Sequence, residues 1–202
     1  MSRATHSAPK LIVGLGNPGA DYSETRHNAG FWFCERLAAR DGARFARESR
    51  FHGQVAKGAD GMFLLMPDTF MNRSGQAVGA LARFYRIAPA QIVVVHDELD
   101  LPPGQARLKF GGGLGGHNGL KDIAAHCATQ DFWRLRLGIG HPGDRGAVVS
   151  YVLKPPRKEE RALIDETIDR ALAAWPDVER GAFDAAIQKI NARPARSKEA
   201  SS

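Results

Sequence analysis

Two residues from distant parts of this sequence have the chemistry of a general base and its supporting acid. His27 lies in a polar stretch between an apolar run and an amphipathic segment, and Asp97 ends the most strand-like run, QIVVVHD. An aspartate bonded to one imidazole nitrogen holds a single tautomer and leaves the other nitrogen free to take a proton from water. Taken alone, each residue is typical of a surface or cap position, so the prediction depends on their meeting in space.

Three asparagines form a second candidate group. Asn17, Asn72 and Asn118 each lie in a glycine-rich or turn segment, where asparagine usually serves the backbone geometry. If these segments meet at one edge of a sheet, their carboxamides offer donors and acceptors to a peptide or an oxyanion.

Other catalytic motifs do not occur in the sequence. No serine or cysteine lies in a nucleophile motif such as G-x-S-x-G, and Ser74 is interpreted as a helix cap. Neither H-E-x-x-H nor C-x-x-C spacing occurs, so a zinc site is not expected. A histidine–aspartate pair without these partners predicts activation of water, which suits an activated ester better than an amide.

The segment GLGNPG at 14–19 also matches a dinucleotide-binding pattern, with Glu35 near the place of a ribose-binding acid. In that motif the helix begins within the glycines, so that its amides face the pyrophosphate. Here Pro18 removes one amide and a polar run delays the helix, which disfavours a nicotinamide-dependent oxidoreductase.

The elements that must position these residues alternate between strands and helices. Apolar runs predict strands at 10–14, 52–57, 62–66, 91–97, 106–110 and 133–139. Periodic segments predict helices at 28–41 (with Asn28 as N-cap), 74–86, 119–128, 159–174 and 177–191, and a short element at 148–153. Because turn residues at 58–61 predict a hairpin, the expected fold is a three-layer α/β/α domain with a mixed, mostly parallel twisted sheet.

Three polar loops should meet at the carboxyl edge of that sheet, where open α/β sheets bind ligands. They are residues 14–28, 67–75 and 96–119. The loop at 14–28 is longer than the ~2–6 residues typical of such connections, and long loops are often functional.

Composition and the two ends bound the class of protein. The 202 residues, 43% of them hydrophobic, can bury one sizeable core, and they carry a net charge of +6. Residues 1–9 and 192–202 are interpreted as flexible tails around a single domain at 10–191.

The sequence has no signal-peptide core and no run of about 18 apolar residues, so a cytoplasmic protein is expected. Cys34 and Cys127 are interpreted as reduced core residues.

Basic residues alternate along two predicted strands. Arg107 and Lys109 share a face of one strand, Arg134 and Arg136 share a face of another, and Lys121 in the predicted helix at 119–128 belongs to the same basic group. Paired strands would join them into one patch suited to phosphates, although a solvated sheet face is an equally ordinary explanation. A non-catalytic RNA-binding protein that uses this patch alone is therefore a second alternative, and a metal hydrolase a more distant one.

Six motifs follow one another in a fixed order along most of the chain. They are GLGNPG at 14–19, RHNAG at 26–30, FMN at 70–72, HDELDLPPG at 96–104, GGGLGGHNGLKD at 111–122 and LRLGIGHPG at 135–143. Over roughly residues 10–190 the sequence therefore resembles the bacterial peptidyl-tRNA hydrolase family. The resemblance implies a monomeric α/β enzyme that cleaves the ester between a peptide and the 3′ ribose of tRNA. It also implies tRNA recycling without a cofactor, a metal or a required protein partner.

The same resemblance implies roles for individual residues. His27 is then the general base, Asp97 the acid that supports it, and Asn17 a residue that helps to distinguish blocked from free aminoacyl groups. The positions that resemble the family's substrate-binding cleft are Tyr22, Phe70, Met71, Asn72, His117 and Asn118. Lys109 and Arg136 resemble the pair that clamps the 5′ phosphate of tRNA. Leu114 occupies a position that is histidine in some relatives, which affects the glycine-rich stretch and not the chemistry.

Overall fold

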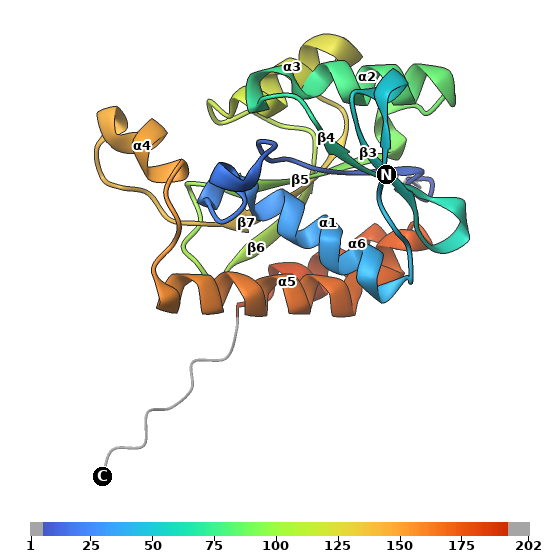
Figure 1. Cartoon of the computed structure of the whole chain (residues 1–202). Coiled ribbons are helices and arrows are strands. Elements are labelled where there is room, and N and C mark those ends of the chain that lie inside the picture. The colour runs from blue at the N-terminus through green and yellow to red at the C-terminus, as the bar shows by residue number, and fades with distance from the viewer. Residues whose placement is uncertain (1–5, 194–202) are drawn as a thin grey trace.

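A single seven-stranded sheet runs through the computed structural model, which describes residues 6–193 (Figure 1). The spatial order of the strands is β2-β3-β4-β1-β5-β7-β6. Their bounds are β1 Leu11–Gly14, β2 Ala46–Glu48, β3 Gly53–Lys57, β4 Phe63–Pro67, β5 Ile92–Glu98, β6 Ala106–Phe110 and β7 Trp133–Gly138. Strands β4, β1, β5 and β7 pair in parallel, whereas β3 and β6 run antiparallel to β4 and β7.

Helices cover both faces of the sheet. Their bounds are α1 Ala29–Arg40, α2 Ser74–Phe84, α3 Asn118–Cys127, α4 Val148–Val152, α5 Lys158–Glu179 and α6 Phe183–Asn191. Figure 1 shows α2 and α3 on one side of the sheet and α1, α5 and α6 on the other. The predicted three-layer α/β fold with a mixed, mostly parallel sheet is confirmed. Within residues 6–193, none of the helices has the length and apolar character needed to span a bilayer.

The central strands are apolar on both faces because each face has its own core. In β1, Ile12 packs with the layer of α1 and α5, while Leu11 and Val13 pack with the layer of α2 and α3. Successive side chains of a strand point to opposite faces, so a continuous apolar run is what a strand between two helical layers requires.

Helices leave the neighbouring parallel strands β1 and β4 toward opposite faces of the sheet. The chain after β1 continues into α1 on one face, and the chain after β4 continues into α2 on the other (Figure 1). Such a divergence is where open α/β sheets bind ligands, and it places the predicted polar loops at one edge.

The elements differ from the sequence prediction in two places. The prediction missed strand β2, because its sequence Ala-Arg-Glu has no apolar run and the strand forms only by pairing with β3. The break predicted near residue 175 does not occur, since α5 continues through Pro176 to Glu179 and the next helix begins at Phe183. Proline inside a helix costs about 3 kcal/mol, but burial of Trp175 and Val178 on either side of it outweighs that penalty.

The end of the N-terminal segment packs against the sheet. The His6 ring lies 4.6 Å from the centroid of Phe110 and 4.8 Å from that of Trp133. The prediction of a loose tail is therefore wrong at His6, because an aromatic cluster at the β6 edge offers it a partner. Pro9 is also buried, whereas Ser7 and Ala8 are exposed. Residues 1–5 of that predicted tail, and residues 194–202 of the tail predicted at 192–202, lie outside the described residues.

Candidate active site

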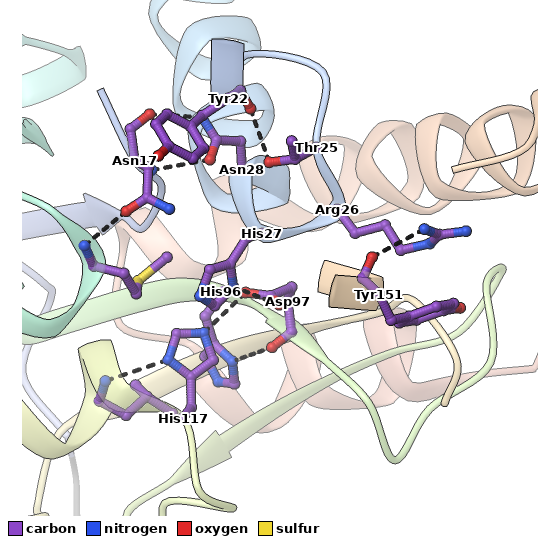
Figure 2. A network of polar contacts seen from close by, with 12 residues as sticks. Asn17, Tyr22, Thr25, Arg26, His27, Asn28, His96, Asp97, His117 and Tyr151 are labelled. Atoms are coloured by element: carbon purple, nitrogen blue, oxygen red, sulfur yellow. Dashed lines mark hydrogen bonds and ion pairs between the residues drawn. The ribbon is translucent and has the colours of Figure 1, made fainter. Parts of the chain in front are cut away.

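The predicted histidine–aspartate pair is present at the carboxyl edge of the sheet. After β1 the chain forms two short 3₁₀ turns, and His27 lies in the second of them, just before α1. Asp97 lies near the end of the neighbouring strand β5. His27 Nδ1 and Asp97 Oδ2 are 2.9 Å apart (Figure 2). The structure therefore brings together two residues that are 70 positions apart in sequence.

The charges of this pair suit proton abstraction. Burial alone would raise the pKa of Asp97, but the neighbouring His27 and His117 hold that pKa well below its usual range. Burial opposes protonation of His27, yet the Asp97 carboxylate outweighs it and raises the pKa of the imidazole. Asp97 is therefore a carboxylate that accepts the Nδ1 proton of His27, and His27 Nε2 carries the lone pair that can take a proton.

A second histidine holds the other oxygen of the same carboxylate. His117 Nε2 donates to Asp97 Oδ1 at 2.8 Å, and its Nδ1 accepts from the backbone N–H of Leu120 at the start of α3. These two contacts fix the tautomer of His117 and the position of Asp97 (Figure 2). His117 was predicted to bind substrate; it borders the cavity described below, but its ring nitrogens bond protein groups.

A third histidine lies beneath the pair and was not predicted. The His96 Nδ1–H donates to the backbone carbonyl of Asp97 at 2.8 Å, and its Nε2 is buried without a partner. Burial, reinforced by His117, lowers the pKa of His96 to about 3, so this ring is neutral. Its position inside an apolar strand offered no sequence signal.

Asn17 is held on three sides. Its Oδ1 accepts from the backbone N–H of Met71 at 2.7 Å, and its backbone N–H and C=O bond the side chain of Asn28 at 2.9 Å each (Figure 2). With Oδ1 engaged, the Nδ2 amide is the group that Asn17 offers to a ligand. Asn28 lies at the predicted N-cap position of α1, but the cap prediction was wrong because its side chain binds the Asn17 backbone instead of α1.

Asn17, His27 and Asp97 border one cavity of about 810 Å³. Among its lining residues are all the predicted catalytic and cleft positions: Asn17, Tyr22, His27, Phe70, Met71, Asn72, Asp97, His117 and Asn118. The Phe70 side chain is 59% exposed and meets the Tyr22 ring edge-on, so the rim offers an apolar surface to a ligand.

The loop after β4 differs from its prediction in one detail. Ser74 begins α2 and its hydroxyl donates to the carbonyl of Met71, so it does not cap the helix. The Met71 side chain is 5% exposed and packs in the core beside α2 and α3. Met71 therefore contributes to the site mainly through the backbone N–H that orients Asn17.

The four predicted basic residues share one face of the paired strands β6 and β7, but they are not one free patch. Arg107 lies opposite Arg136, and Lys109 opposite Arg134. Arg134 is buried and donates to the carbonyls of Gly111 and Gly113, and Arg107 donates to the carbonyl of Asn191. Only Lys109 among the four is an exposed residue.

Arg136 is already engaged in an ion pair. Its Nε donates to Glu98 Oε1 at 2.6 Å, and its Nη2 lies 2.5 Å from the same oxygen. Both side chains are largely buried, at 20% and 13% exposed. A phosphate that bound Arg136 would share the guanidinium with Glu98 or displace that carboxylate.

The geometry of the glycine segment excludes a dinucleotide fingerprint. Helix α1 begins at Ala29, well beyond Gly19, so its N-terminal amides do not face the glycines. A Cβ on Gly14 would lie 2.4 Å from the Gly30 carbonyl oxygen, and one on Gly30 would lie 2.3 Å from that of Val95. These glycines allow α1 to pack closely on β1 and β5.

His27, Asp97 and His117 also form the group that could bind a metal among the described residues, with ligand atoms within 4.8 Å of one another. Two imidazoles and a carboxylate are a donor set that zinc accepts. The nitrogens in question already bond Asp97 at 2.8–2.9 Å, so the hydrogen bonds account for this arrangement.

Comparison with known proteins decides the family. The family model described as peptidyl-tRNA hydrolase matches residues 11–199 of this chain. The chain belongs to the peptidyl-tRNA hydrolase family. This confirms the resemblance seen in the sequence motifs, and membership makes the protein a hydrolase.

Individual members of the peptidyl-tRNA hydrolase family are similar over nearly their whole length. A peptidyl-tRNA hydrolase of Aromatoleum aromaticum is 73% identical over 190 residues, which cover 94% of this chain and 97% of that protein. One from Thiobacillus denitrificans is 67% identical, with 98% of both chains covered. The crystal structure of the Acinetobacter baumannii peptidyl-tRNA hydrolase has a TM-score of 0.89 and 47% identity, covering 96% of this chain and 98% of that one.

Proposed function

We propose that this peptidyl-tRNA hydrolase cleaves the ester between a peptide and the 3′ ribose of tRNA with His27 as general base. The observation that supports this most is the bond between His27 and Asp97 at the edge of a large cavity. The carboxylate keeps the proton on Nδ1, so Nε2 is the acceptor for a water proton.

The reaction follows from that arrangement. Nε2 of His27 takes a proton as the water oxygen attacks the ester carbonyl carbon, and an oxyanion forms. The Nδ2 amide of Asn17 is the donor we assign to the bound substrate, either to that oxyanion or to the peptide carbonyl. The carbonyl–O3′ bond then breaks, and the imidazolium returns its proton to the 3′ oxygen. The products are a tRNA with a free 3′ hydroxyl and a peptide carboxylic acid, which releases its proton to solvent and becomes a carboxylate.

We assign different parts of the substrate to the cavity wall and to the β6–β7 face. We assign Tyr22, Phe70, Asn72 and Asn118 to the peptide and the 3′ end of tRNA, because they border the cavity beside His27. Lys109 is assigned to a tRNA phosphate because it is exposed, with Arg136 as the second ligand if Glu98 gives way. The proposal includes action as a monomer in the cytoplasm, where the enzyme recycles tRNA released from interrupted translation without a protein partner.

Replacing the base tests the mechanism. His27→Ala is expected to lose about 10²–10⁴-fold or more of the rate on N-acetylaminoacyl-tRNA, because general-base catalysis contributes that much. The matched control is His52→Asn, an exposed left-handed position at which asparagine is tolerated. A His27→Ala enzyme with near wild-type rate contradicts the assignment.

The same assay separates the alternatives. A non-catalytic RNA-binding protein releases no acetylated amino acid, and a metal hydrolase loses activity when a chelator is added. We expect release of the acetylated amino acid at a rate that the chelator does not change.

A further inference from the structure

We propose that Arg26 is a positioning residue that fixes the cavity wall formed by α4 relative to His27. Arg26 immediately precedes His27 in the chain, and its side chain is 7% exposed. The proposal rests on the proposed function of His27 and adds a residue that touches neither substrate nor the reacting atoms.

The contacts of Arg26 converge on the end of α4. Its backbone N–H donates to the carbonyl of Lys154 at 3.1 Å, and its Nη1 donates to the carbonyls of Tyr151 and Lys154 at 3.0 and 3.3 Å. Its guanidinium carbon lies 3.9 Å from the centre of the Tyr151 ring. Figure 2 shows Arg26 extending from the His27 segment to Tyr151.

A third group holds the guanidinium in place. Arg26 Nη2 donates to Glu160 Oε2 at 3.0 Å, and the Glu160 side chain is 16% exposed. Glu160 lies in the first turn of α5, which follows α4 directly. Arg26 therefore joins the base-bearing segment, the end of α4 and the start of α5 at one point.

Helix α4 depends on such contacts for its position. It has only five residues, and helices this short are not stable without tertiary support. Arg26 binds the Tyr151 carbonyl in the last turn of α4 and the Lys154 carbonyl just beyond it, where a cation complements the helix dipole. The Tyr151 hydroxyl also ties α4 to the sheet, because it donates to the Ile139 carbonyl just after β7 at 2.7 Å.

The other side of α4 is a wall of the catalytic cavity. Val148, Val149, Val152 and Leu153 line that cavity together with His27. Val149 is 70% exposed, so an apolar surface faces the space where substrate must lie. A shift of α4 relative to His27 would move bound substrate away from the base, and misplacement by about 1 Å costs about 10²-fold in rate.

The test compares two arginines that tie helices together. In Arg26→Lys the charge opposite Glu160 remains, but one ammonium has fewer donors and lacks the planar fork that reaches both carbonyls and the carboxylate. The matched control is Arg36→Lys, which alters an arginine of α1 that pairs with Asp165 and Asp169 of α5 and has no bond to α4.

We expect Arg26→Lys to lower kcat on N-acetylaminoacyl-tRNA about 10–100-fold. KM should change little, because Lys109 and the rest of the β6–β7 face are untouched. Hydrogen exchange should become faster in residues 148–154 and remain unchanged in the central strands. Arg36→Lys should retain wild-type kcat and wild-type exchange in residues 148–154.

Three results overturn the proposal: wild-type kcat in Arg26→Lys, faster exchange throughout the sheet, or an equal loss of kcat in Arg36→Lys.

The His27→Ala variant, measured in the same assay, distinguishes failure of this proposal from failure of the proposed function. If His27→Ala is inactive and Arg26→Lys is normal, only the role of Arg26 fails. If His27→Ala is active, the base assignment fails, whereas loss of kcat with local exchange in Arg26→Lys still supports a fixed α4.

Discussion

At the scale of single residues, one carboxylate organises the site. Asp97 accepts from His27 and from His117, and the backbone carbonyl of the same residue accepts from His96. Each of these bonds removes one possible tautomer from an imidazole. In the proposed mechanism this leaves His27 Nε2, at the border of the cavity, as the nitrogen that takes a proton.

The first prediction at this scale concerns pH. His27 works as a base only when it is neutral, so kcat/KM rises with pH through its pKa, which Asp97 raises above the usual value. In Asp97→Asn the carboxylate charge is lost while burial remains, and burial lowers the pKa of His27. We expect the acid limb of the profile to move to lower pH.

Asp97→Asn should also lower the plateau of kcat by about 10²-fold or more, since asparagine can stabilise the wrong tautomer. A pH–rate profile measures both effects, with exposed Asp60→Asn as the control. Equal losses in kcat and in tRNA binding, or an unmoved acid limb, would contradict this account.

The second prediction concerns the choice between blocked and free aminoacyl groups. In Asn17→Asp the remaining Oδ1 still accepts from the Met71 N–H, but the amide donor is replaced by a second carboxylate oxygen. That oxygen repels a peptide carbonyl and attracts the ammonium of a free aminoacyl group. We expect the ratio of kcat/KM for N-acetylaminoacyl-tRNA to that for aminoacyl-tRNA to fall at least about 10-fold, since unpaired polar groups penalise the natural substrate.

Comparison of initial rates on the two substrates measures that ratio. Asn72→Asp places the same charge in the cavity wall without the Met71 contact and serves as the control. If both variants change the ratio equally, any added negative charge in the cavity wall has this effect, and the assignment of Asn17 is wrong.

At the scale of elements, the β6–β7 pair holds similar basic side chains in two different environments. Arg134 anchors the glycine loop at 111–113 by donating to two of its carbonyls, and burial lowers the pKa of its guanidinium. Lys109, directly opposite on β6, is exposed. The alternating pattern correctly predicted that Lys109 and Arg134 lie on one face of the sheet. It did not show that Arg134 is buried and bonded to carbonyls, so only Lys109 of these two is available to a phosphate.

The prediction at this scale uses that contrast. Lys109→Ala should weaken tRNA binding and reduce the slope of log K against log salt by about one, as expected for one lost phosphate contact. Arg134→Lys should leave the slope unchanged, because a buried guanidinium bonded to carbonyls releases no counterion. Titrations of tRNA at several salt concentrations provide the slopes. If Lys109→Ala keeps the wild-type slope, Lys109 is not a phosphate ligand.

At the scale of the whole molecule, the site exists because the sheet divides its helices between two faces. The chain after β1 bends toward α1 and the chain after β4 toward α2, so the loops that carry Asn17 and Met71 meet across the gap. The close approach of Gly14 and Gly30 lets α1 lie against β1.

The amino-acid sequence was sufficient for the layers of the fold, for most strands and helices and for the pairing of His27 with Asp97. These follow from local signals: apolar runs, turn residues, and functional groups at the ends of strands that share one edge. The motifs added the family, because several of them occur in a fixed order.

Other features arise only when distant segments pack together. Nothing near Arg26, His96 or Arg134 in the sequence shows that they bond the end of α4, the Asp97 backbone and the glycine loop. Pro176 likewise looks like a helix breaker until the burial of its neighbours is known. The physical reason is the same in each case: burial and bond partners come from residues far away in the chain, and they decide whether a polar group is free for a ligand or already satisfied.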